Sequence, residues 1–124
     1  MQSSNSAGTT GQSTNAGIFD YLTAESSQNN IIPVANAGPN LIVYSYNYVT
    51  LDGSQSYDSN GNPLNFSWKQ FAGDPVVAVS NYNAANPIVI APIVAYPTTL
   101  TFQLVVNNGQ AYSNPSYVYV LVEP

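Results

Sequence analysis

The chain has 124 residues and a formal net charge of −5, because one basic residue faces six acidic ones. Clustered Lys and Arg neutralise phosphate groups, so this composition excludes nucleic acid as a partner and argues against binding to anionic membranes. Cysteine and histidine are both absent. Disulfides, thiolate metal sites and histidine-based catalysis are therefore excluded. No apolar run is long enough for membrane insertion, which needs roughly 18 residues.

Residues 1–30 form a polar, flexible arm in the sequence-based prediction. Residues 1–17 are low-complexity Ser, Thr, Asn, Gly and Gln, which bury too little apolar surface to offset chain entropy. Residues 18–24 form an apolar island, and residues 25–30 are polar again. Two interpretations of the island stay open: a linker or strand on this domain's own edge, or a strand donated to a neighbouring subunit. The island residues expected at an assembly contact are Ile18, Phe19, Tyr21 and Leu22.

From residue 31 short apolar stretches alternate with turn residues. Strands are predicted at residues 31–36 and 41–48, the second with Tyr44, Tyr46 and Tyr48 on one face. Residues 49–70 predict a strand, a polar elbow, a tight turn and a second strand. That second strand carries Trp68, the only tryptophan, which is expected at the centre of the core.

Further strands are predicted at residues 76–80, 87–92, 99–106 and 117–122. Asn108-Gly109 favours a type I′ hairpin turn between the last two. Strict alternation places every second residue of 99–106 on one apolar face. Seven or so short strands separated by turns predict an all-β, Ig-like two-sheet antiparallel sandwich at residues 31–124, with an extended N-terminal arm.

Several blocks of this sequence resemble the PKD domain, a family of immunoglobulin-like sandwiches in extracellular and surface proteins. The blocks are PVANAGPN (33–40), VTLDGSQSYD (49–58), NGNPLNFSW (60–68), NPIVIAP (86–92) and TTLTFQLVVNNGQAYS (98–113). The resemblance implies the sandwich fold and an extracellular or cell-surface location. It implies less about function, because such domains serve as spacers, adhesion modules, surface-layer parts and enzyme appendages.

Family members usually carry acidic residues in the elbow, in its turn and at the later hairpin, and some bind calcium through them. Here those positions are amides: Asn60, Asn62, Asn107 and Asn108. Only Asp52 and Asp58 remain as calcium ligands, with much of the charge lost. The alternative is that Asp52 and Ser54 hydrogen-bond the elbow's own backbone. No other cofactor is expected.

The sequence predicts no enzyme, since without His or Cys only carboxylate pairs or a Ser67/Lys69 dyad remain as catalytic candidates. Asn65-Phe66-Ser67 is the single N-glycosylation sequon, because the one at Asn114 contains a proline. Asn65 is expected to point outward, so a glycoprotein is sterically feasible.

Tyrosines are frequent on strand faces predicted to point outward, and these residues are the remaining candidates for a contact surface: Tyr44, Tyr46, Tyr117 and Tyr119, joined by Leu121. Three interpretations of these residues stay open. They are single exposed aromatics, they belong to the inner face of the second sheet, or they form an interface that stacks glycans or packs subunits.

The main hypothesis is a non-enzymatic, extracellular subunit that polymerises with copies of itself into a pilus-like filament by donating residues 18–24. The alternative is a carbohydrate- or protein-binding adhesion or spacer module of a larger surface protein.

Overall fold

The computed structural model describes residues 6–7, 9–10 and 31–124. The chain divides into two units, Met1–Ile31 and Ile32–Pro124. In the first, β1 (Ser6–Ala7) and β2 (Thr9–Thr10) pair in parallel, in a stretch where the sequence predicts no regular structure. The island at residues 18–24 lies outside the described residues. None of the described residues belongs to a helix that could cross a membrane.

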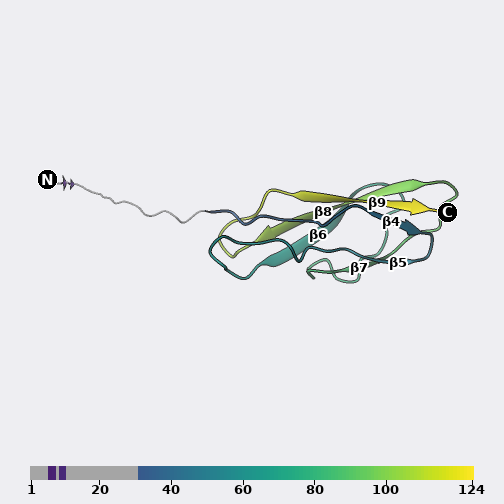
Figure 1. Ribbon diagram of the computed structural model, residues 1–124, viewed down its shortest axis with the longest axis horizontal. Helices are drawn as coiled ribbons and strands as arrows, with labels where there is room; N and C mark the ends of the chain where they lie inside the picture. Colours follow the sequence, from purple (N-terminus) through teal and green to yellow (C-terminus); the bar gives the residue numbers. More distant parts are fainter. Residues whose placement is uncertain (1–5, 8, 11–30) are drawn as a thin grey trace. The chain divides into compact units, whose positions relative to one another are not determined.

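Residues 32–124 form two facing sheets (Figure 1). The larger sheet has the strand order β4-β9-β8-β6. Its strands are β4 (Leu41–Tyr44), β9 (Ser116–Glu123), β8 (Thr98–Asn107) and β6 (Asn65–Ala72). The smaller sheet pairs β5 (Tyr48–Thr50) with β7 (Ile88–Ile90). The predicted Ig-like sandwich is confirmed, with one difference: β4 and β9 run parallel, whereas the other pairs of the sandwich are antiparallel.

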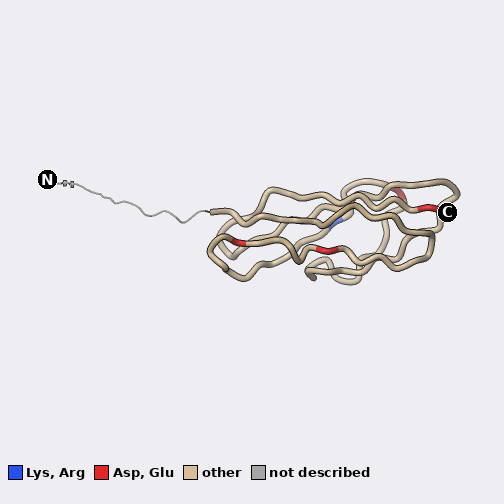
Figure 2. The backbone as a smooth tube through the Cα atoms, viewed as in Figure 1, with Lys and Arg blue, Asp and Glu red and all other residues tan. Residues whose placement is uncertain are grey.

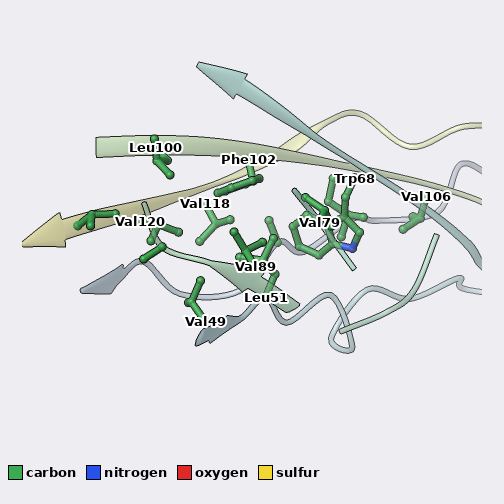
Figure 3. Packing of buried hydrophobic residues seen from close by; sticks show 14 residues of the cluster. Val49, Leu51, Trp68, Val79, Val89, Leu100, Phe102, Val106, Val118 and Val120 are labelled. Carbon is green, nitrogen blue, oxygen red and sulfur yellow. The ribbon is translucent and has the colours of Figure 1, made fainter. Parts of the chain in front are cut away.

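The hydrophobic core fills the space between the sheets, where Figure 3 shows Trp68, Phe102 and Leu51. On β8 and β9 every second residue is buried, as the alternation predicts. These core residues are Leu100, Phe102, Leu104 and Val106 on β8, and Val118, Val120 and Val122 on β9. The Trp68 indole Nε1 donates to the Ala84 carbonyl oxygen at 2.9 Å, so its one polar group is satisfied inside the core.

Two predicted strands are wrong. Residues 31–36 contribute only one bridge, Val34 to Tyr57, because Pro33 lacks the N–H needed to continue a ladder. Residues 76–80 contribute only a bridge from Val79 to Val89. There the Val77 N–H donates to the side-chain oxygen of Gln70 at 2.9 Å instead of to a backbone carbonyl oxygen of a neighbouring strand.

The predicted strand at 41–48 is also wrong, because the chain changes sheets within it. β4 ends at Tyr44, a turn follows, and Tyr46 adopts a left-handed backbone with φ of 71°. The Ser45 N–H still donates to Glu123 of the large sheet, whereas the Tyr46 N–H donates to Ala91 beside the small sheet. The tyrosines at 44, 46 and 48 therefore do not share one strand face.

The loop between β8 and β9 is not a type I′ hairpin turn. That turn needs positive φ at both central residues, and only Gly109 has it, at 92°. Instead, the Asn107 Oδ1 accepts from the Gly109 N–H, and the Asn108 Oδ1 accepts from the N–H groups of Gln110 and Ala111. Side-chain amides that fold back on the backbone hold this loop.

Residue 32 and residue 124 lie at opposite ends of the sandwich (Figure 1). The Ala37 N–H donates to Ser116 Oγ and the Tyr119 N–H donates to Asn40 Oδ1, so the first segment runs beside β9 and in the same direction. Residues 32–124 thus begin at one end of the sandwich and finish at the other, as Figure 1 shows.

Candidate functional site

The elbow after β5 is closed by Asp52. Its Oδ1 accepts from the Ser54 N–H at 2.9 Å, from Ser54 Oγ at 2.5 Å and from Asn86 Nδ2 at 3.0 Å. The Ser54 hydroxyl, then the Ser54 N–H and the Asn86 amide, hold the pKa of this carboxyl below its ordinary value. The hydrogen bonding to the elbow's own backbone that the sequence predicts as the alternative to a metal site is present.

The turn after the elbow is closed by Asp58. Its Oδ1 accepts from Asn108 Nδ2 at 2.8 Å, and its Oδ2 accepts from the N–H groups of Asn62 at 2.9 Å and Asn60 at 3.1 Å. The Asn108 amide, and then the Asn62 N–H, lower the pKa of Asp58. The Asn108 side-chain amide thus acts as a donor and joins two loops that are distant in sequence.

The two carboxylates serve different loops and share no hydrogen-bond partner: Asp52 contacts Asn86, and Asp58 contacts Asn108. Figure 2 shows acidic residues at separate points of the tube and a single basic one. Among the described residues no three His, Cys, Asp or Glu side chains group together. Calcium at Asp52 and Asp58 stays a prediction, with one carboxylate from each of two separate turns as its protein ligands.

Close packing fixes the elbow between these carboxylates. A Cβ on Gly53 would lie 3.0 Å from the Trp68 ring and 3.0 Å from the Leu104 side chain. The elbow therefore presses directly on the core, and a glycine is needed there for space. This part of the sequence acts as scaffold.

The sequon lies at the beginning of β6. Asn65 is exposed and pairs with Asn107 of β8, and Ser67 is exposed on the same strand. A glycan on Asn65 would extend into solvent, and glycosylation stays a prediction. Lys69 is likewise exposed on β6.

Three rings gather on the outer surface of the large sheet, and we call them the aromatic face: Phe71, Tyr117 and Tyr119. Their side chains are 53%, 37% and 50% exposed. Phe71 and Tyr117 meet edge-to-face with ring centroids 4.9 Å apart. Gln103 lies on β8, between β6 and β9, and its Nε2 donates to the Tyr117 hydroxyl oxygen at 3.1 Å. This hydrogen bond holds the Tyr117 ring in place.

Sequence reasoning missed Phe71, which it placed in a loop after Gln70. The structure extends β6 to Ala72, and Phe71 continues the outward row of Asn65, Ser67 and Lys69. The odd-numbered alternation of that row was the signal that could have identified it.

The other predicted contact residues divide into three groups. Leu121 pairs with Ile42, and Tyr44 pairs with Glu123, so both extend the outer surface of the large sheet beyond the aromatic face. Tyr46 lies in the turn between the sheets and does not join that surface. The island residues Ile18, Phe19, Tyr21 and Leu22 lie outside the described residues.

The family model described as K319L-like, PKD domain matches residues 37–122, so the chain belongs to the PKD domain family. These domains occur in extracellular or surface proteins, typically as non-catalytic modules. The chain is also 34% identical over 107 residues to chitinase A of Pseudoalteromonas piscicida. That match covers 86% of this chain and 12% of chitinase A, so the chain corresponds to a small accessory part of that protein.

Solved structures share the fold. One is a nucleoside hydrolase-related hypothetical protein from Saccharophagus degradans, associated with carbohydrate metabolism, with a TM-score of 0.56 and 27% identity. The match covers 73% of this chain and 24% of that one. The PKD domain of the KIAA 1837 protein has a TM-score of 0.55 and 23% identity, covering 80% of this chain and 91% of that one. At that identity the likeness is one of fold.

Proposed function

We propose that this PKD domain is a non-catalytic, polysaccharide-binding module of a larger extracellular protein. The aromatic face carries the proposal. Ring faces attract the C–H groups of a sugar because their π-systems are electron-rich, and a sheet holds several rings in fixed positions. Phe71 on β6, and Tyr117 and Tyr119 on β9, supply such rings from two strands of one sheet that flank β8.

The names of two relatives support a carbohydrate ligand. One is a chitinase and the other is associated with carbohydrate metabolism. The arrangement of the sandwich supports a modular role, because residues 32–124 begin and finish at opposite ends (Figure 1). A module of this form can hold flanking segments apart while its sheet surface contacts a polymer.

Co-sedimentation with insoluble chitin and insoluble cellulose tests the binding. The double variant Tyr117→Ala/Tyr119→Ala should bind about tenfold more weakly, since each ring contributes roughly 0.5–1.5 kcal/mol. Tyr96→Ala is the matched control, because Tyr96 is 72% exposed in the loop before β8. An equal loss in both variants, or no binding by the unmodified chain to either polymer, would contradict the proposal.

A second candidate is self-assembly into filaments, in which residues 18–24 of one copy pair with a sheet edge of the next. An unpaired strand edge on β5, described below, favours it. A head-to-tail contact of this kind does not close on itself, so it produces fibres. Negative-stain imaging of the full chain and of a chain lacking residues 1–24 tests it. Identical filaments from both chains would exclude donation.

A further inference from the structure

The outer edge of β5 offers free main-chain groups. In the β5–β7 ladder Val49 pairs with Val89, and the Leu51 N–H donates to the Pro87 carbonyl oxygen at 2.9 Å. Odd-numbered residues of β5 therefore face β7, and the N–H and C=O groups of Tyr48 and Thr50 point away from it. Within residues 31–124 no hydrogen bond satisfies those outward groups.

The opposite edge of the small sheet is covered. The Ser80 N–H donates to the Ile88 carbonyl oxygen, and Ser80 Oγ accepts from the Ile88 N–H, both at 2.9 Å. On β5 no proline, lysine or bulge blunts the edge, as proteins usually arrange on exposed strands. A two-stranded sheet is marginal by itself, and a third strand would complete it.

The surroundings of this edge are apolar on both sides of the sheet. On the outer side lies a hollow of about 220 Å³. Its lining residues are Tyr48, Ala78, Val79, Ser80, Ile88 and Ile90. On the inner side, Leu41 and Val43 of β4 are only half-buried against the core. This hollow extends from Tyr48 over β7, so a strand added at the free edge would lie beside Tyr48 on its outer side and meet Leu41 and Val43 on its inner side.

We propose that the outer edge of β5 accepts residues 18–24 of a second copy of this chain as a third strand. This inference rests on the self-assembly function proposed above. The island suits the site because each of its alternating rows is apolar apart from one residue, Asp20 in one row and Thr23 in the other. The uncharged row of Phe19, Tyr21 and Thr23 would face inward, and Ile18 and Leu22 would lie on the outer side next to Tyr48.

The direction of the chain argues for a second copy over the same copy. Val34 and Tyr57 bridge in antiparallel orientation, so Ile32 and Pro33, which precede Val34, run beyond Tyr57 and away from β5. To pair with its own β5, the island would have to reverse direction and return. The link from residue 24 to residue 31 spans at most about 25 Å even when fully extended. A strand from another copy is free of this restriction.

Cysteine cross-linking of the full chain tests the proposal, because the chain contains no native cysteine. Ala24 belongs to the row assigned to the outer side, where Thr50 also points. Chains with Ala24→Cys and chains with Thr50→Cys are mixed and treated with a short bis-maleimide. We expect the covalent heterodimer as the major product. Ser67→Cys replaces Thr50→Cys as the control, because Ser67 is equally exposed but lies on β6.

Two results would overturn the inference. One is cross-linking no stronger than with Ser67→Cys. The other is an intrachain cross-link as the main product of the double variant Ala24→Cys/Thr50→Cys in dilute solution. If removal of residues 1–24 abolishes filaments while these chains fail to cross-link, self-assembly stands and the assignment to β5 fails.

A pair of proline variants gives an independent measurement. Thr50→Pro removes an outward N–H from β5, and Ile42→Pro removes the equivalent outward N–H from β4, whose odd-numbered residues face β9. We expect loss of oligomers in sedimentation velocity for Thr50→Pro alone, with both variants folded by circular dichroism. Oligomers that survive Thr50→Pro in the folded state would contradict the proposal.

Discussion

The two strands β6 and β5 are both edge strands, yet the chain treats their outer edges differently. Along β6, the Trp68 N–H donates to the Tyr82 carbonyl oxygen at 2.8 Å, and the Phe66 carbonyl oxygen accepts from Asn83 Nδ2 at 3.0 Å. Along β5 the corresponding groups have no partner within residues 31–124. Among residues 31–124, only one side of the sandwich is closed by neighbouring segments of the chain.

The difference shows that a bare edge is not a necessity of this fold. The segment between β6 and β7 closes the β6 edge without forming a strand, through main-chain and amide contacts. Residues 31–40 do not do the same for β5, because their single bridge falls at Tyr57, beyond the strand. The outer edge of β5 is therefore open to pairing with an added strand.

Truncating one aromatic residue at each edge should produce the largest contrast. Trp68→Ala empties the core beside the covered edge and should lower the free energy of unfolding by about 3–5 kcal/mol. Tyr48→Ala removes an exposed ring and should change it by no more than about 0.5 kcal/mol. Urea denaturation of the chain lacking residues 1–24 measures both. Losses of similar size would mean that the β5 side is as closely packed as the β6 side.

Polar truncation should give a smaller contrast. Asn83→Ala leaves the Phe66 carbonyl oxygen without its donor and should cost about 1 kcal/mol. Thr50→Ala should be close to neutral. Hydrogen exchange sharpens the comparison in the same truncated chain: the Trp68 amide should be protected and the Thr50 amide should exchange rapidly. Protection of Thr50 that appears only in the full chain would mark a docked strand.

The smallest effect concerns pH and the turns that follow β5. The pKa of Asp58 is lowered in the folded state, chiefly by the Asn108 amide. Its contribution to stability is therefore present above the unfolded pKa of about 4 and is lost as pH falls through the folded value. Asp58→Asn should flatten the dependence of the urea midpoint on pH below about 4.

Asp74→Asn is the control for that pH series, because Asp74 is exposed and its side chain makes no hydrogen bond within residues 31–124. If Asp74→Asn flattened the acid limb as much as Asp58→Asn, the hydrogen bond to Asn108 would not explain the pKa shift. Asp52→Asn, at the end of β5 itself, should behave like Asp58→Asn, because Ser54 and Asn86 lower the pKa of Asp52.

Several features of the molecule follow from the sequence alone. The alternation along residues 99–106 and 117–122 predicts β8 and β9 and their buried rows correctly, because side chains of a strand alternate with period two. The burial of Trp68 follows from a local strand pattern. The hydrogen bond from the Ser54 N–H to the Asp52 carboxylate follows from a local Asx turn.

Other features depend on which strands meet. The exchange of sheets between Tyr44 and Tyr48 is invisible in a run that alternates continuously. The contact of Phe71 with Tyr117 crosses β8, and the bond of Asn108 to Asp58 joins residues 50 apart in the chain. Whether an edge is covered depends in the same way on segments distant in sequence. Periodicity determines the face on which a side chain lies, and only tertiary pairing determines which strand lies beside it.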